Sequence, residues 1–383
     1  MGEETKKAGL AAICKAVEDA NPGVKFDIQG IDYNQYAPLL KTKIAAGDAP
    51  DIIFGRPFSY PELVEAGHMM DLKGQPFLSR INQFALDGVT VGGIIAGLPI
   101  DMDIRSVYYN KDMFAKIGAE VPTTNKELIA VCEKFMAAGI QPFSLPLKKV
   151  NLPVDFMTTI LFPMIYNSNP TLFTDIQAKK KTFADDPKFA QAVEIMNKSI
   201  LNFVDPGDYG IEENQGNMNF ASGKYPMIVN GMWALADFRK ANPNGRFGTF
   251  AFPWSDNPAD NKLLVGLDDI FMVSATTKNK DIVLKFLDLY CSPAGTKIWM
   301  DNAKMISVVK GVSPSNPDEM QVGMVDMINK GQIAPMTNIM ALSGEYNQKY
   351  TEAFQVYAAG SKASRADVKA FVTKLMKDIS NIQ

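Results

Sequence analysis

Residues with reactive or metal-binding side chains are scarce in this sequence of 383 residues. It contains three cysteines (Cys14, Cys132 and Cys291) and a single histidine, His68. Three widely spaced cysteines do not form the pattern of a disulfide framework or of a zinc site, so we expect buried free thiols. One histidine excludes a histidine-rich metal cluster, and it leaves a catalytic triad a single candidate base. We therefore expect neither a metal nor a cofactor.

Long apolar runs and an excess of one charge are also missing. No run approaches the roughly 20 apolar residues that a membrane-spanning helix needs. The formal net charge is -3 and no long basic stretch occurs, so nucleic acid is not an expected partner. With 46% hydrophobic and 21% charged residues, the composition is that of an ordinary globular protein, and the length suggests two domains.

The first residues, "MGEETKKAGL", do not have the pattern of a signal peptide. Acidic residues stand where a leader would be basic, and no apolar segment follows them. Taken by itself, this start predicts either a cytoplasmic protein or a mature chain from which a leader has been removed.

Helical and strand patterns alternate along the first part of the chain. Apolar spacing predicts a helix over 3–20, and alternation predicts a strand over 24–28. A second helix over 33–46 and a short buried strand over 51–54 follow. This order predicts an α/β fold with a mainly parallel sheet and helices on both of its faces.

Further patterns predict a hairpin over 91–100 with its turn at Gly97, and strands over 105–110 and 263–277. A capping box from Thr124 to Glu127 predicts the start of a helix. Because no flexible linker separates two domains, the strands near 105–110 and 263–271 are candidates to cross between them.

The stretch "FASGKYPMIVNGMWALADFRK" (220–240) combines a buried strand, a turn and a helix, with Trp233 where the helix opens. Open α/β sheets present ligand-binding side chains at such strand-to-helix turns. An indole offers a flat apolar face for a sugar ring and an N–H for a hydroxyl. Trp233 is thus a candidate ligand platform. The alternative is a tryptophan packed in the core between helix and sheet.

Four segments together resemble the extracellular solute-binding proteins of ABC importers, family 1, the maltose-binding-protein-like carbohydrate binders. They are 45–54, 97–140, 220–240 and 265–295, in the family's order and with similar spacing. This resemblance implies a two-lobed α/β clamshell of the periplasmic-binding-protein type (type II), with the ligand in a cleft that closes about a hinge, as periplasmic binding proteins do. It places 1–106 with 269–310 in an N-terminal lobe, and 107–268 with 311–383 in a C-terminal lobe.

The resemblance implies a set of ligand-binding residues. The "NGMW" segment matches the family's Gly-x-Trp, so it assigns Gly231 and Trp233 to the site. Asp103 matches a polar cleft residue, and the adjacent Asp268 and Asp269 lie in the second crossing segment. Carboxylates accept hydrogen bonds from hydroxyls strongly. Neighbours on a strand point to opposite faces, so we expect one of the pair, preferably Asp269, to face ligand. The alternatives are a surface charge for Asp103 and a hinge hydrogen-bond network for the pair.

Further candidates lie in loops. The loop after 51–54 offers four of them (Arg56, Phe58, Ser59 and Tyr60) to the cleft floor. Arg56 suits a bidentate contact with hydroxyls or with an acidic sugar, and its alternative is a surface arginine. Tyr166 and Trp254 are possible aromatic walls, each with a structural role as the alternative.

This sequence departs from the family pattern at its start, because a first strand normally precedes the first helix and is missing or shortened here. The resemblance implies an extracytoplasmic location, either periplasmic or as a cell-surface lipoprotein of a Gram-positive bacterium. The expected partners are a carbohydrate ligand and the permease subunits of an ABC importer, and we expect a monomer.

Two other functions stay open. A glycosidase would use paired carboxylates such as Asp103 and Asp269. A binder of another solute, such as a polyamine, would enclose it with acids and aromatics. No nucleophile-elbow, phosphate-loop or dinucleotide fingerprint occurs, so the expectation is a binding protein rather than an enzyme.

Overall fold

The computed structural model describes residues 4–31, 33–148, 152–165, 168–169, 171–336 and 344–379. The chain divides into two compact units, which we call unit 1 (Met1–Asp103 with Gly266–Pro317) and unit 2 (Ile104–Val265 with Asp318–Gln383). It passes from one unit to the other within two strands, β5 and β9, and again after Pro317. None of the described helices has the length and apolar character to span a bilayer.

Unit 1 packs six helices around a three-stranded sheet, as counted over its described residues. Its helices are α1 (Glu4–Ala20), α2 (Tyr33–Ala45), α3 (Pro61–Glu65), α4 (Gln83–Gly88), α12 (Lys280–Cys291) and α13 (Pro293–Ala303). The sheet has the order β1 (Ile52–Phe54), β10 (Ile270–Val273), β4 (Leu98–Pro99), and both pairings are antiparallel. β2 (Thr90–Val91) and β3 (Ile94–Ile95) form a separate hairpin. Two 3-10 helices, η1 (Pro57–Ser59) and η2 (Pro76–Arg80), complete the unit.

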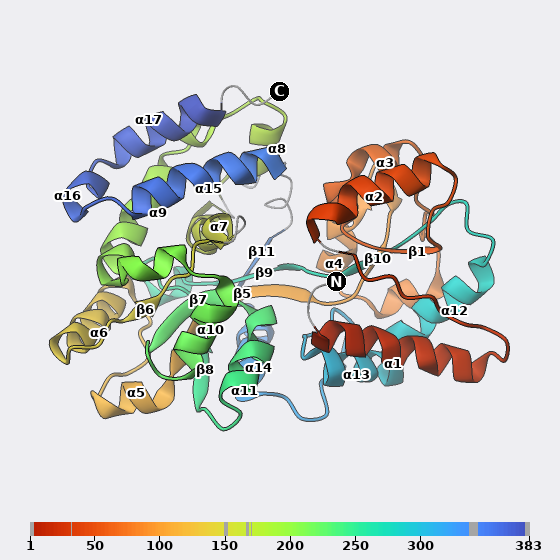
Figure 1. Ribbon diagram of the computed structural model, residues 1–383, viewed down its shortest axis with the longest axis horizontal. Helices are drawn as coiled ribbons and strands as arrows, with labels where there is room; N and C mark the ends of the chain where they lie inside the picture. The colour runs from red at the N-terminus through yellow and green to blue at the C-terminus, as the bar shows by residue number, and fades with distance from the viewer. Residues whose placement is uncertain are drawn as a thin grey trace. The chain divides into compact units, whose positions relative to one another are not determined.

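Helix α1 lies along α13 in unit 1 (Figure 1). The apolar stripe that predicted α1 includes Ile13 and Val17, and both are buried. Gly9 permits close approach to α13, because a Cβ atom at this position would lie 3.0 Å from the Trp299 ring. The first helix therefore contributes directly to the core of this unit.

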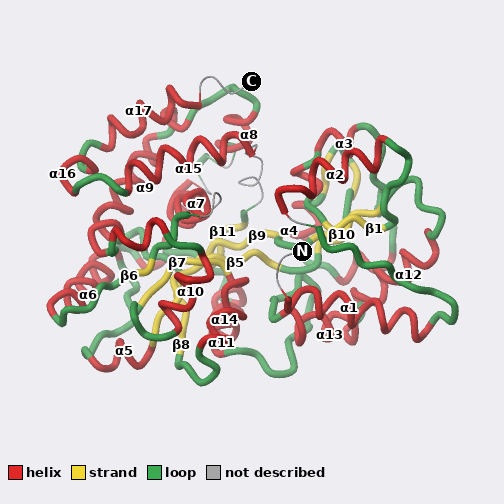
Figure 2. Tube along the Cα trace, in the orientation of Figure 1, coloured by secondary structure: helices red, strands yellow, loops and turns green. Residues whose placement is uncertain are grey.

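Unit 2 is built on a six-stranded mixed sheet. Its order is β11 (Ile333–Pro335), β9 (Leu263–Leu267), β5 (Met102–Asn110), β7 (Met227–Gly231), β6 (Phe143–Ser144), and β8 (Phe247–Phe250) pairs with β5. Its helices are α5 (Lys111–Lys116), α6 (Asn125–Ala137), α7 (Leu152–Ile165), α8 (Leu172–Gln177), α9 (Pro187–Ser199), α10 (Glu213–Ala221), α11 (Leu235–Ala241), α14 (Glu319–Asn329), α15 (Gly344–Ala358), α16 (Lys362–Arg365) and α17 (Val368–Ile379). Short 3-10 helices are η3 (Phe183–Asp185), η4 (Leu201–Phe203), η5 (Pro206–Gly210), η6 (Met232–Ala234) and η7 (Pro258–Asp260). Figure 2 shows β5, β7 and β8 side by side, with α10 and α14 next to them.

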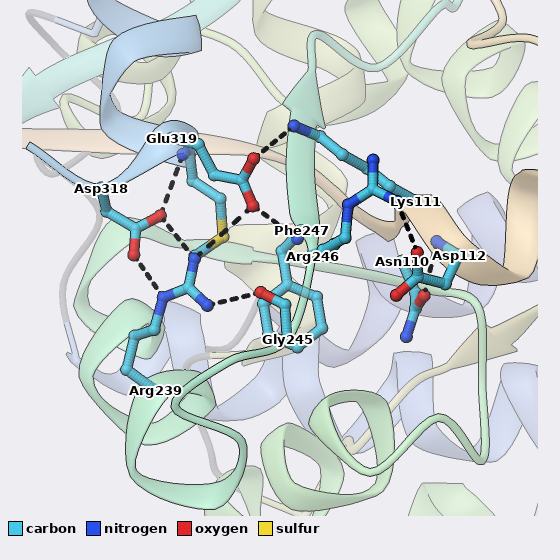
Figure 3. A network of polar contacts seen from close by, with 10 residues as sticks. Asn110, Lys111, Asp112, Arg239, Gly245, Arg246, Phe247, Asp318 and Glu319 are labelled. Atoms are coloured by element: carbon cyan, nitrogen blue, oxygen red, sulfur yellow. Dashed lines mark hydrogen bonds and ion pairs between the residues drawn. The ribbon is translucent and has the colours of Figure 1, made fainter.

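The start of α14 is tied into unit 2 by charged side chains (Figure 3). Arg239 on α11 forms a bidentate pair with Asp318, the N-cap residue of α14. Glu319 accepts a hydrogen bond from Lys111 at 2.6 Å and one from the Phe247 backbone N–H at 3.0 Å. These contacts hold the segment at the point where the chain re-enters unit 2.

Three predictions about local structure are wrong. The predicted strand over 24–28 is not formed, because the Phe26 N–H bonds to the Glu18 carboxylate at 2.8 Å instead of a neighbouring strand. The hairpin turn lies at Gly92–Gly93, where both φ angles are positive, and not at Gly97. The sheets are not mainly parallel, because both pairings in the unit 1 sheet are antiparallel and β5 of unit 2 pairs antiparallel with both β7 and β8.

Candidate functional site

Trp233 lies where unit 2 changes from strand to helix. The apolar residues of β7 are buried, and the 3-10 helix η6 follows directly and leads into α11. Trp233 is partly exposed on η6, whereas Trp299 is completely buried in unit 1. The strand-to-helix turn is formed where the sequence predicted it, and it leaves the Trp233 side chain partly exposed.

Gly231 makes room for this indole. A Cβ atom at position 231 would lie 2.0 Å from the Trp233 ring, so any side chain there would displace it. The glycine is required by this close approach, because its own φ of -89° is open to any residue. The Gly-x-Trp spacing is therefore a packing requirement in which the ring folds back over the end of β7.

The indole N–H of Trp233 already has a partner within unit 2. It donates to the Glu213 carboxylate, the first residue of α10, at 2.6 Å. In this structure Glu213 therefore occupies the N–H that the sequence offered to a ligand hydroxyl.

Arg105 reaches the same place from β5. It stands opposite Gly231 in the β5–β7 register, and its guanidinium carbon lies 5.9 Å from the Trp233 ring centroid. Its Nη1 contacts Asp155 Oδ1 and donates to Thr158 Oγ1, both at 2.9 Å, so α7 supplies both partners. Arg105 is 4% exposed. Its positive charge is balanced by the negative charge of Asp155, so the pair adds no net charge beside the indole.

A recess of unit 2 opens next to this cluster. Its wall is mostly apolar. The residues that line it are Arg105, Leu145, Pro146, Leu147, Leu152, Asp155, Phe156, Thr159, Val229, Asn230 and Gly231. Its volume of about 20 Å³ is room for about one water molecule, so the recess by itself does not accommodate a sugar ring.

The carboxylates of Asp268 and Asp269 meet in unit 1 around a lysine. Lys6 Nζ of α1 lies 2.6 Å from Asp268 Oδ2 and 2.8 Å from Asp269 Oδ2. Arg56 adds two contacts to Asp268, from Nε to the backbone oxygen at 2.8 Å and from Nη2 to Oδ1 at 2.5 Å. The expectation that the pair points to opposite faces is wrong, because β9 ends before Asp268 and β10 begins after Asp269.

Asp101 is the third acid of this cluster and is completely buried. It accepts hydrogen bonds at 3.0 Å from the Asp269 backbone N–H and from the Trp299 indole N–H. Burial, and then the nearby charge of Asp269, raise the pKa of Asp101 well above its ordinary value. Burial also acts to raise the pKa of Asp268, but Lys6 and Arg56 outweigh it and lower that pKa to about 2.

These acids are the one group among the described residues whose oxygen atoms come close enough together to hold a metal ion, within 4.8 Å of one another. The Lys6 ammonium lies on two of the three carboxylates, where a cation would bind. The geometry is that of a closed ion-pair network beside the two crossing strands.

A family model described as bacterial extracellular solute-binding protein matches residues 12–324. This chain belongs to the bacterial extracellular solute-binding proteins. The resemblance seen in its sequence is thereby confirmed. The family to which the chain belongs is described as extracellular.

Several proteins similar to this solute-binding protein are named for sugars. The multiple sugar-binding protein of Streptococcus mutans serotype c is 24% identical over 325 residues, which are 82% of this chain and 75% of that protein. The structure of RafE in complex with raffinose has a TM-score of 0.78 at 22% identity and covers 98% of both chains. A Bacillus licheniformis sugar transporter in complex with stachyose has a TM-score of 0.75 at 16% identity, covering 100% of this chain and 98% of its own. These structures confirm the predicted fold, a type II, two-lobed α/β clamshell.

Of the other predicted residues of this solute-binding protein, Asp103 and the loop 58–60 lie in unit 1 and Trp254 lies in unit 2. Asp103 is buried at 1% exposure in β5, so it is not a surface charge. Trp254 packs against the core of unit 2, and its N–H donates to the Asp260 carbonyl at 3.1 Å. Phe58, Ser59 and Tyr60 lie in and after η1, with Ser59 exposed and the other two partly so. Tyr166 lies outside the described residues.

Four residues that organise these sites were missed in the sequence. Arg105 had a signal, because a charged residue inside the buried strand β5 needs a buried partner. Lys6 carried a weaker signal, on the apolar side of an otherwise amphipathic helix. Glu213 and Asp155 gave no local signal, since their roles depend on residues 20 and 50 positions away.

Proposed function

We propose that this protein is the substrate-binding component of a bacterial ABC importer and that it binds a mono- or oligosaccharide. The observation that carries this proposal is the partly exposed indole of Trp233, fixed over Gly231 at the end of β7. An aromatic face of this kind stacks well on the apolar C–H face of a pyranose ring. The same proposal assigns four further residues to the surroundings of the ligand or to the hinge between the lobes: Asp103, Asp268, Asp269 and Arg56.

The names of the relatives support a sugar as ligand. One is called a multiple sugar-binding protein, and two solved structures hold raffinose and stachyose. All three are named for carbohydrates, so we carry the class of ligand, and not any one sugar, to this chain.

The pairing of charges supports an uncharged ligand. Arg105 is paired with Asp155, and Arg56 with Asp268. An acidic sugar would need an arginine whose guanidinium N–H groups bind the ligand carboxylate. A polyamine would need carboxylates whose oxygens bind the ligand ammonium groups. Neutral saccharides are therefore preferred over uronic acids and polyamines.

The remaining parts of the proposal follow from family membership. We infer that the protein acts outside the cytoplasm, in the periplasm or as a surface lipoprotein, and that it delivers its ligand to permease subunits as a monomer. Binding would close the lobes about the crossing strands, driven by contacts that exist only in the closed state. We infer a binding protein without catalytic turnover.

A thermal-shift screen tests the proposal. The panel holds raffinose, stachyose, xylo- and chito-oligosaccharides and simple hexoses, with uronic acids, polyamines and amino acids as the competing classes. A ligand present at 100 times its Kd stabilises the protein by about 2.7 kcal/mol, which raises the melting temperature by about a degree or more. A rise with a neutral saccharide supports the proposal. A rise only with a polyamine, or turnover of a chromogenic glycoside, would overturn it.

A further inference from the structure

Helix α10 contacts the β7–η6 turn at two points, one helical turn apart. Glu213 and Asn217 are four residues apart, so they lie on the same face of α10. Glu213 accepts the Trp233 indole N–H, and Asn217 Oδ1 accepts from Asn230 Nδ2 at 2.9 Å. Asn230 Oδ1 in turn accepts from the Gly231 backbone N–H at 2.8 Å. Both the ring and the backbone beneath it are therefore bonded to one face of one helix.

The helix itself is fixed behind these contacts. Asn217, which is 1% exposed, also donates to Asp237 Oδ2 on α11 at 2.9 Å. Gly216 packs so tightly on Pro146 that a Cβ atom there would lie 2.5 Å from the proline ring. Three residues on one face of α10 therefore make these contacts: Glu213, Gly216 and Asn217. They make the helix a fixed support for the turn.

The two ends of the Trp233 ring are held in different ways. The six-membered ring end, with Cζ3 and Cη2, lies against Gly231, and the opposite N–H end is bonded to Glu213. Held at both ends, the indole cannot turn about χ2 without breaking the Glu213 bond or moving off the glycine. These two contacts therefore define the plane of the ring.

We propose that Glu213 is a positioning residue for ligand binding, which acts through Trp233 by fixing the plane of the indole. This inference rests on the proposed function of Trp233 as a saccharide platform. Stacking depends on the orientation of the ring, and a side chain that is already ordered loses less entropy when the ligand binds. Glu213 therefore raises saccharide affinity without a contact to the saccharide.

Affinity measurements on three variants test the role of the acceptor oxygen. Glu213→Leu removes the acceptor and is expected to weaken binding of the responding saccharide by about tenfold, as for loss of a hydrogen bond to a charged group. Glu213→Gln keeps an acceptor and is expected to stay within about threefold of wild type. Glu212→Leu is the matched control, since Glu212 is an exposed neighbour paired with Lys148 and is expected to leave affinity unchanged.

A double-mutant cycle separates positioning from direct contact. In a Trp233→Ala background, Glu213→Leu is expected to have no further effect, because the ring that it positions is gone. An equal loss in both backgrounds would mean that Glu213 binds the saccharide itself and would overturn the proposal. Unchanged affinity of Glu213→Leu in the otherwise wild-type protein would overturn it as well.

The state of the indole is measurable without any ligand. The ¹H–¹⁵N resonance of the Trp233 indole, assigned by its loss in Trp233→Phe, is expected far downfield in the wild type and in Glu212→Leu. It is expected to shift upfield and to exchange faster with solvent in Glu213→Leu. An unchanged resonance would contradict the positioning role. This readout keeps failure of the inference distinct from failure of the saccharide proposal, which the ligand screen decides.

Discussion

Close packing at Gly231 shows how one residue without a side chain shapes the candidate site. The ring of Trp233 occupies the volume that a Cβ atom would take. The glycine therefore matters for the placement of its neighbour and not for backbone freedom.

Gly231→Ala is expected to weaken saccharide binding by about tenfold or more, because a methyl group 2.0 Å from the ring forces the indole out of its plane. Isothermal titration calorimetry measures the affinity, and urea unfolding checks that the fold persists. Gly210→Ala is the matched control in unit 2, since a Cβ atom there would meet nothing within 4 Å. Wild-type affinity in Gly231→Ala would contradict this account of the glycine.

Lys6 is a buried charge that pairs with Asp268 and Asp269 in unit 1. Lys6→Met keeps the length of the side chain but leaves the buried carboxylates of Asp268 and Asp269 without their ammonium. Breaking a buried ion pair in this way is expected to lower the free energy of unfolding by about 3 kcal/mol. Lys15→Met, which removes an exposed pair with Asp19 on the same helix, is expected to change it little. Equal stability of the two variants in urea would show that the cluster does not stabilise the fold.

At the scale of elements, α14 depends on the charge of its N-cap residue. Asp318 caps the helix by accepting from the Met320 N–H at 3.0 Å, and it also pairs with Arg239. Asp318→Asn retains a good N-cap side chain and removes the ion pair, so it separates the two roles.

We expect Asp318→Asn to lower the free energy of unfolding by about 1–2 kcal/mol, because both side chains of the pair are less than a third exposed. Asp326→Asn, on the same helix, removes an exposed pair with Lys330 and is expected to have almost no effect. Urea unfolding of both variants provides the measurement. If Arg239→Met and Asp318→Asn proved strictly additive in the double variant, the two residues would not be coupled.

Elements with strong local signals were predictable. The capping box at Thr124 opens α6 as expected, and the amphipathic stripe of α1 ends before Asn21. The strand predicted over 24–28 failed because strand formation depends on a tertiary partner. Alternation at 24–28 indicates a strand, but a strand also needs a neighbour, and here Glu18 takes the backbone N–H.

The candidate site was predictable to a similar degree. A single indole at a strand-to-helix turn is visible in the sequence, so Trp233 and Gly231 could be named. The groups that orient the indole come from β5, α7 and α10, and only folding brings them together. Likewise, the local sequence around Asp268 and Asp269 gave no sign of the ion pairs that Lys6 makes with both of them.

At the scale of the whole molecule, the buried acids link stability to pH. The pKa of Asp268 is lowered from its ordinary 3.8 to about 2, since Lys6 and Arg56 outweigh the effect of burial. The folded state thus holds this proton less tightly than the unfolded state. The stability that Asp268 contributes is complete above about pH 4 and is lost as the pH falls toward 2. The raised pKa of Asp101 has the opposite effect on stability, because the contribution of this group is lost as the pH rises.

Asp268→Asn is therefore expected to lower the free energy of unfolding on the order of 2 kcal/mol near pH 5, and by progressively less near pH 3. Urea unfolding of the wild type and the variant at both pH values gives the difference directly. A constant difference across this range would show that Lys6 and Arg56 do not depress the pKa of Asp268.

The claim that this solute-binding protein presents Trp233 as a platform for a saccharide is tested most directly by one titration. Calorimetry of the responding saccharide against the wild type and Trp233→Ala, with equal unfolding midpoints as the check on folding, is that measurement. We predict an affinity loss of more than about tenfold, since the proposal assigns to the indole the stacking contact with the sugar ring. Unchanged affinity in Trp233→Ala would contradict the account and would place the ligand elsewhere.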